Sequence, residues 1–158
     1  MSEEARVDFV IGDLDIVYKD SMEIDLGGVT CVLRSVEGSH TDDSTIIYIP
    51  KEKVMFLGDC IYGKYFKGEY GYDGESLFKM MDIIESYETE QWIIAHENIC
   101  DRKDMDEYWG SLKMAWELVG QGTSVEDTTK VFEAKFNREP SKNEKFFIQC
   151  FVNTNKGR

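Results

Sequence analysis

The sequence predicts an α/β fold of the α+β kind, with one mixed β-sheet, helices on one face of it and further helices at the C-terminal end. Apolar residues alternate with a period of two in the first 60 residues, which is typical of strands. From residue 74 onward most apolar residues are spaced by three and four, which is typical of helices. The chain has 158 residues, 42% of them hydrophobic, so one core and one domain are expected.

The predicted strands lie early in the chain. Short apolar pieces at 7–26 suit short strands joined by turns, and residues 29–36 form a longer run. Two further runs, 45–49 and 54–57, flank a turn at 50–53 and predict a β-hairpin. In both hairpin strands the apolar side chains fall on both faces. Each face of the sheet therefore needs a cover.

A helix and a further strand follow the hairpin. Asp73 is a helix-capping residue, and we expect a helix over 74–87 with Leu77, Met81 and Ile84 on one stripe. Residues 91–95 then read as a short strand. The order hairpin, helix, strand places a crossover helix on one face of the sheet.

The C-terminal residues predict three more helices. The first carries apolar residues at spacings of three and four. Ser124 with Asp127, and Ser141 with Glu144, fit the capping-box pattern and open the other two. The aromatic stripes of these helices are more typical of a core than of cofactor contacts.

Composition limits the classes of function. The formal net charge of −13 argues against nucleic-acid binding, because phosphate contacts need clustered Lys and Arg. No apolar run approaches the roughly 20 residues that a membrane-spanning helix needs, and the first residues lack a signal-peptide pattern. The four cysteines are far apart and form no CxxC pair. A reduced, cytoplasmic protein is expected rather than a disulfide framework or a zinc knuckle.

Three polar residues follow predicted strands and form the candidate site. His40 follows the strand at 29–36, Asp59 follows the strand at 54–57, and His96 follows the strand at 91–95. Two imidazoles and a carboxylate are a ligand set that zinc or iron accepts when they converge. Spacing alone leaves a simpler interpretation open, because histidines and aspartates after strands are more often loop and turn residues.

The segment that follows Asp59 is rich in glycine and tyrosine. Residues 62–72 are favoured as a surface connection with partly buried rings. Their position directly after Asp59 keeps a substrate-gripping role open. Cys60 is expected to be a packed side chain rather than a ligand.

Three short motifs occur in order along residues 26–96. They are Gly38-Ser39-His40-Thr41, a strand that ends in Gly58-Asp59, and a strand that ends in a loop histidine, His96. Together they resemble the C-terminal half of a metallo-β-lactamase-fold hydrolase, whose corresponding motifs are Gly-His-Thr, Gly-Asp and Pro-Gly-His. The resemblance implies that His40 is a ligand of one metal, His96 a ligand of a second, and Asp59 the catalytic carboxylate that bridges them. The implied cofactor is zinc or iron.

The departures from the family pattern concern the first half of the fold. The motif His-x-His-x-Asp-His is absent, since no histidine precedes His40, and Ser39 stands between Gly38 and His40. The family fold is a four-layer αββα sandwich, of which this chain is expected to supply half. Residues 1–100 would form the sheet and crossover helix, and 101–158 a helical extension packed on the same domain. The uncovered sheet face predicts a partner, either a second copy or a separate N-terminal half.

Two functions from different classes remain open. The resemblance implies a metal-dependent hydrolase, in which metal-activated water attacks an ester, amide, thioester or phosphodiester of a small molecule once the site is completed. The alternative is a non-catalytic half-domain or interaction module that dimerises through its exposed sheet face. With half of the ligands missing, the three residues are expected to hold a metal weakly or not at all, and the chain alone to be inactive.

Overall fold

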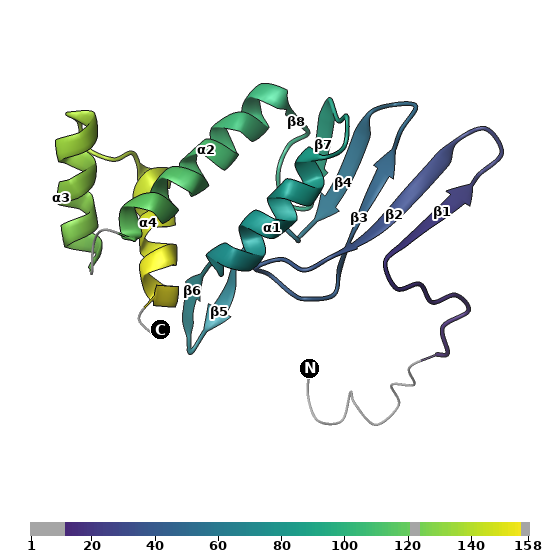
Figure 1. Ribbon diagram of the computed structural model, residues 1–158, viewed down its shortest axis with the longest axis horizontal. Coiled ribbons are helices and arrows are strands. Elements are labelled where there is room, and N and C mark those ends of the chain that lie inside the picture. Colours follow the sequence, from purple (N-terminus) through teal and green to yellow (C-terminus); the bar gives the residue numbers. More distant parts are fainter. Residues whose placement is uncertain (1–11, 121–123, 156–158) are drawn as a thin grey trace.

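The computed structural model describes residues 12–120 and 124–155. Of the short strands predicted over 7–26, the piece before residue 12 lies outside the described residues, and Ser21–Asp25 is a strand. The strand predicted at residues 15–18 is wrong, because those residues pair with no neighbouring strand. Six strands form one mixed sheet in the order β1-β2-β3-β4-β7-β8 (Figure 1). Their bounds are β1 Ser21–Asp25, β2 Thr30–Val36, β3 Ser44–Ile49, β4 Val54–Gly58, β7 Gln91–Ile94 and β8 Cys100–Asp101. The predicted hairpin and the strands on either side of it are confirmed; β8 is a two-residue strand that the sequence did not predict.

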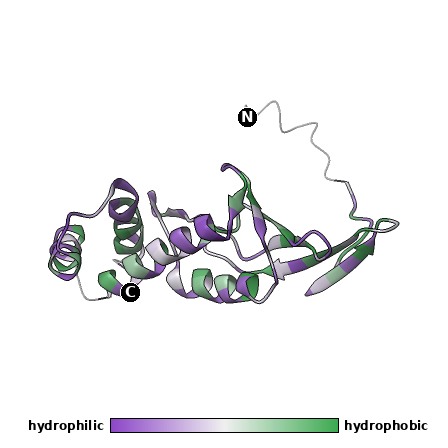
Figure 2. Ribbon diagram, turned by 90° about the horizontal axis from the view of Figure 1, so that it is seen from above, coloured by the Kyte–Doolittle hydropathy of each residue, from purple (hydrophilic) through white to green (hydrophobic). Residues whose placement is uncertain are grey.

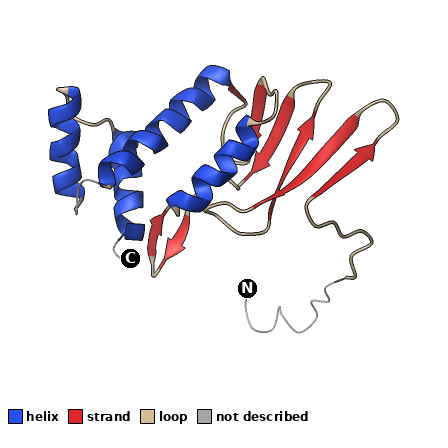
Figure 3. Ribbon diagram, viewed as in Figure 1, coloured by secondary structure: helices blue, strands red, loops and turns tan. Residues whose placement is uncertain are grey.

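The connection from β4 to β7 gives the sheet its mixed character. Strands β1 to β4 pair antiparallel with their neighbours, whereas β4 and β7 are parallel. Parallel neighbours need a crossover, and helix α1, Gly74–Glu85, provides it (Figure 3). Asp73 caps α1 by accepting a hydrogen bond from the Ser76 backbone N–H, at 3.1 Å. The predicted crossover helix is therefore confirmed.

One face of the sheet is buried beneath α1. Seen from above, α1 runs along one side of the sheet (Figure 2). The strand side chains on that face are almost fully buried, and so are the side chains on the apolar stripe of α1. They are Ile46, Tyr48, Met55, Leu57, Trp92 and Ile94 from the sheet and Leu77, Met80, Met81 and Ile84 from α1.

The opposite face of the sheet is apolar and carries no helix among the described residues. The pairing register places Ile47 opposite Phe56, and Phe56 beside Ile93, on this face. The Phe56 side chain is 37% exposed, although it lies in the middle of the sheet. We call this surface the open face; its apolar members are Met22, Ile24, Cys31, Leu33, Ile47, Ile49, Val54, Phe56 and Ile93.

The remaining helices pack beside the sheet and extend its core. Helices α2 (Arg102–Val119), α3 (Val125–Phe136) and α4 (Lys142–Asn155) follow in order, and the capping residues predicted for α3 and α4 are confirmed. One hydrophobic cluster joins them to the sheet and α1. Within the described residues, no helix is long and apolar enough to cross a membrane.

The segment after Asp59 is more ordered than a surface connection. Strands β5 (Lys64–Phe66) and β6 (Glu69–Gly71) form a separate two-stranded hairpin. Its two-residue turn, Lys67-Gly68, has positive φ at both positions, as hairpin turns of this length require. Lysine is uncommon in that conformation, which hid the hairpin in the sequence.

Candidate metal centre

The three candidate residues leave the sheet at one edge. Strands β2 and β4 are both antiparallel to β3, so they run in the same direction, and β7 is parallel to β4. The loops that begin at the C-terminal ends of β2, β4 and β7 therefore emerge together. These loops carry His40, Asp59 and His96 respectively.

Asp59 and His96 are brought together. The Asp59 Oδ1 atom lies 3.2 Å from His96 Nε2. The Oδ1 atom itself is buried and accepts no hydrogen bond from the described residues. The side chains as a whole are more open: that of Asp59 is 43% exposed and that of His96 is 73% exposed. Gly58, which has φ of +54°, makes the turn that directs the carboxylate away from β4. A buried carboxylate oxygen without a hydrogen bond is suited to a cation or to a protonated imidazole.

His40 is fixed by a different contact. Its Nδ1 atom lies 2.9 Å from the Gly63 carbonyl oxygen, and because a carbonyl only accepts, Nδ1 carries the proton. In the neutral ring, Nε2 then keeps a free lone pair. This is the arrangement that orients most metal-binding histidines in proteins. The structure does not, however, bring His40 into one group with Asp59 and His96.

The loop before His40 is held in place by close contacts. The Ser39 side chain is fully buried, and its hydroxyl accepts a hydrogen bond from the Asp73 backbone N–H at 2.6 Å. A Cβ atom at Gly38 would lie 2.8 Å from the Cys60 carbonyl oxygen. The serine that departs from the family pattern therefore ties the His40 loop to the start of α1, and the glycine lets that loop approach the one that follows β4.

Cys60 is a core residue and not a ligand. Its side chain is 2% exposed. Burial, reinforced by the neighbouring Asp59 carboxylate, raises the pKa of the Cys60 thiol to about 12. The thiol is therefore protonated near neutral pH, as expected of a packed side chain.

Tyr62 belongs to the site, although the sequence did not single it out. Its ring centroid lies 5.8 Å from that of His96. Burial raises the pKa of the Tyr62 phenol, so the group is neutral. Tyr62 also lines a cavity together with Tyr70 and Tyr72 of the same segment. The one signal in the sequence that pointed to this role was the position of the whole segment 62–72, close after Asp59.

The donor atoms fit a metal in type but fall short in number. A carboxylate oxygen and an imidazole nitrogen are ligands that zinc and iron accept. A stable zinc site uses three or four protein ligands. Within residues 12–120 and 124–155, no group of three or more His, Cys, Asp or Glu side chains is positioned to hold a metal ion. The chain therefore presents two converging donors, with a third, His40, at the same edge of the sheet.

Comparisons with known proteins identify the fold. No family model and no curated protein sequence matches the chain. The chain is similar in structure to a stereoselective inverting sec-alkylsulfatase from Pseudomonas sp., with 17% identity over 82% of this chain and 22% of that one and a TM-score of 0.52. It is also similar to an archaeal metallo-beta-lactamase superfamily protein from Sulfolobus tokodaii. That match has 20% identity over 61% of this chain and 39% of the other, with a TM-score of 0.49.

A third similar structure is a metallo-beta-lactamase family protein from Thermus thermophilus. That match has 14% identity over 89% of this chain and 49% of the other, with a TM-score of 0.47. At such identities a likeness shows the fold alone. The chain thus shares an α/β fold with part of the sec-alkylsulfatase structure, and the predicted α/β fold class with one mixed sheet is confirmed. It spans less than half the length of each of these three structures.

Proposed function

We propose that this chain is one half of a metal-dependent hydrolase of the metallo-β-lactamase type. The observation that carries the proposal is the convergence of Asp59 Oδ1 and His96 Nε2, at 3.2 Å, from the ends of two parallel strands. Their position at the C-terminal edge of the sheet is where ligands bind in open α/β sheets. The substrate class is a small molecule with an ester, amide, thioester or phosphodiester bond.

Each residue of the site has a distinct part in this proposal. Asp59 Oδ1 and His96 Nε2 would hold the metal, and His40 would contribute Nε2, which its Nδ1 contact with Gly63 leaves free. A bound zinc or iron would lower the pKa of a water molecule and so supply a nucleophile. The Tyr62 ring lies beside the His96 ring, with 5.8 Å between the ring centroids. The ligands still missing would come from a complementary half.

A partner is proposed for the open face. Large exposed apolar patches on soluble proteins usually mark an interface. The support is the run of apolar side chains across five neighbouring strands, with Phe56 exposed near its centre. In the isolated chain we propose that a second copy covers this face.

A cytoplasmic location is also proposed. All four cysteines lie among the described residues, and all four are free thiols. Free thiols at Cys31 and Cys100, which are only partly buried, suit a reducing compartment.

Zinc titration of the Asp59→Ala variant tests the metal proposal. Wild-type protein should bind zinc weakly, and Asp59→Ala should reduce the affinity by about tenfold or more, because one of two converging ligands is lost. Asp43→Ala is the matched control, since Asp43 is an exposed carboxylate in the loop after His40. Binding would be measured by calorimetry. Equal zinc binding by wild type and Asp59→Ala would contradict the assignment.

A further inference from the structure

A cavity next to the candidate metal centre has an unusual lining. Its volume is about 740 Å³, within the range of small-molecule sites. It lies between the β5–β6 hairpin, the loop after β7, and helices α2 and α4. Its wall includes six aromatic side chains: Tyr62, Tyr70, Tyr72, Tyr108, Phe146 and Phe147.

The aromatic rings form a connected wall. The Tyr70 and Phe146 rings are stacked with centroids 6.0 Å apart, and the Tyr108 and Phe147 rings meet edge to face at 5.6 Å. Tyr72 contacts Tyr70 and Phe147 and so joins the two pairs. Rings held by one another in this way keep their positions when a ligand enters, which lowers the entropic cost of binding.

All the charge in the lining is negative. Glu97, Asp104 and Glu107 line the cavity, and among the described residues no lysine, arginine or histidine does. Lys103 reaches Glu107 at 3.8 Å from an exposed position, but Glu97 has no ion pair within the described part of the chain. Burial raises the pKa of Tyr72 and Tyr108, so their phenols stay neutral and the charge belongs to the carboxylates.

We infer that this cavity binds an organic ammonium ion. The faces of aromatic rings attract cations, and they do so most strongly where water is excluded. Carboxylates nearby add a net attraction that a neutral or anionic ligand would not feel. The combination of an aromatic wall with acidic groups is the chemistry by which proteins recognise quaternary ammonium groups and protonated amines.

The cavity also adjoins the candidate metal centre. Tyr62 lines the cavity and places its ring 5.8 Å from the His96 ring. An ammonium group held in the cavity would therefore lie next to the residues that flank Asp59 and His96, among them Tyr62 and Glu97. The relevance of this position to a metal centre rests on the proposed function, whereas cation binding itself does not.

Titration with choline, followed by calorimetry and by NMR, tests the inference. Choline and the neutral isostere 3,3-dimethylbutan-1-ol have the same shape and differ in charge. We expect saturable choline binding, and binding of the neutral analogue weaker by roughly threefold to tenfold. A protonated primary amine of similar size, measured in parallel, distinguishes the two kinds of ammonium ion.

Charge-removing variants locate the site. Glu97→Gln combined with Glu107→Gln should weaken choline binding by roughly threefold to tenfold. Glu52→Gln is the control, because Glu52 is an exposed carboxylate in the β3–β4 turn; it should change binding by less than about twofold. Circular dichroism would establish that all the variants fold.

Three outcomes would overturn the inference: no saturable binding of either cation, equal binding of choline and its neutral isostere, or unchanged binding in the doubly substituted protein. The result is separable from the metal proposal. Asp59→Ala should weaken zinc binding and leave choline binding intact, so either claim can fail without the other.

Discussion

At the scale of single residues, the two histidines have different surroundings, which would give them different parts in the proposed metal site. His40 is held by the Gly63 carbonyl, at 2.9 Å, before any ligand arrives. His96 is largely exposed, and its polar contact is with Asp59. A ring fixed by the backbone loses little freedom on binding a metal, whereas an exposed ring must be ordered. The proposed site would thus be preorganised at His40 and not at His96.

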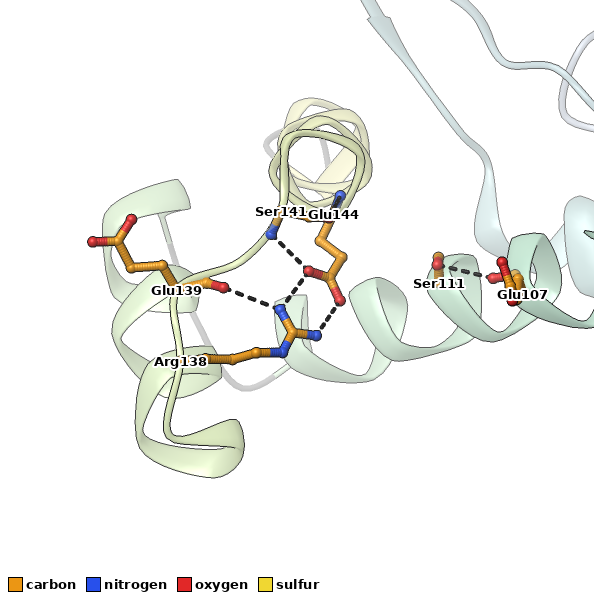
Figure 4. Close-up of polar contacts among 6 residues, drawn as sticks. All are labelled: Glu107, Ser111, Arg138, Glu139, Ser141 and Glu144. Carbon is orange, nitrogen blue, oxygen red and sulfur yellow. Dashed lines mark hydrogen bonds and ion pairs between the residues drawn. The ribbon is translucent and has the colours of Figure 1, made fainter.

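The Glu144 carboxylate on α4 has its pKa lowered by hydrogen-bond donors that are held in place around it. Arg138 donates two hydrogen bonds to Glu144, at 2.7 and 2.8 Å, and the Ser141 backbone N–H donates a third (Figure 4). The Arg138 hydrogen bonds are the main cause that lowers the pKa of Glu144 to about 2. The Glu144 side chain is 14% exposed, so screening by solvent is limited.

The lowered pKa predicts an acid-dependent loss of stability. Glu144 has a lower pKa when folded than its usual value of about 4.3, so its contribution is present above pH 4.3 and is lost as the pH falls toward 2. Glu144→Gln should lower the free energy of unfolding by about 1–2 kcal/mol at pH 7 and by much less near pH 2. Urea unfolding across this pH range measures the difference. Glu139→Gln is the control; an equal pH dependence in wild type and Glu144→Gln would contradict the assignment.

Residue types and their order along the chain predicted where the candidate site lies, but not how its atoms meet. A histidine or an aspartate directly after a strand is visible in sequence, so the shared sheet edge followed from strand direction. The Gly63 carbonyl was not visible, because backbone groups carry no sequence signal of their own. Tyr62 was hidden among several tyrosines, and only the folded β5–β6 hairpin shows which rings face the cavity.

At the scale of elements, α1 is positioned by its first residue. A Cβ atom at Gly74 would lie 2.6 Å from atoms of the Trp116 ring on α2. Contacts shorter than 3.0 Å between these atoms do not occur without movement of the ring or the helix. Gly74 therefore sets how closely the start of α1 approaches α2.

Two glycine-to-alanine substitutions separate this packing effect from helix propensity. Gly74→Ala should lower the free energy of unfolding by about 1–3 kcal/mol, because the added methyl group overpacks the contact with Trp116. Gly110→Ala is the matched change in the middle of α2, where a Cβ would meet nothing within 4 Å. It should stabilise the protein by roughly 0.5–1 kcal/mol. Urea denaturation of the two variants measures both; changes of the same sign would contradict the packing account.

Most elements were predictable because their patterns are local. Period-two runs marked β2, β3 and β4, and the capping residues Asp73, Ser124 and Ser141 marked the starts of α1, α3 and α4. The missed elements are short. Strand β8 has two residues and forms only because it meets the edge of β7, a tertiary contact that no local pattern encodes.

At the scale of the whole molecule, the sheet is covered on one face only within the described part of the chain. Helix α1 buries its apolar stripe against that face, and α2 to α4 lie beyond the edge of the sheet (Figure 1). The two faces have similar apolar character, which the alternation in β3 and β4 already predicted. An apolar face left in water lowers solubility and favours association. The open face is therefore the surface on which the proposed partner would pack.

The net charge of −13 does not oppose association through this face. The strand residues that the register places on this face are uncharged along β1 to β4 and β7, and the carboxylate on this face, Asp101, lies on the edge strand β8. Two copies can therefore approach over the central strands without placing carboxylates opposite one another. Charges elsewhere on the surface are screened beyond about 8 Å at physiological ionic strength.

Light scattering coupled to size-exclusion chromatography tests the central claim, that the open face is an interface. At about 100 μM, a concentration that reveals weak dimers, wild-type protein should run as a dimer of the 18.3 kDa chain. Phe56→Glu, which places a charge near the centre of the face, should run as a folded monomer. Tyr65→Glu is the control, because Tyr65 is a 74% exposed ring on the β5–β6 hairpin; it should remain a dimer. A folded wild-type monomer at that concentration, or a Phe56→Glu protein that still dimerises, would contradict the account.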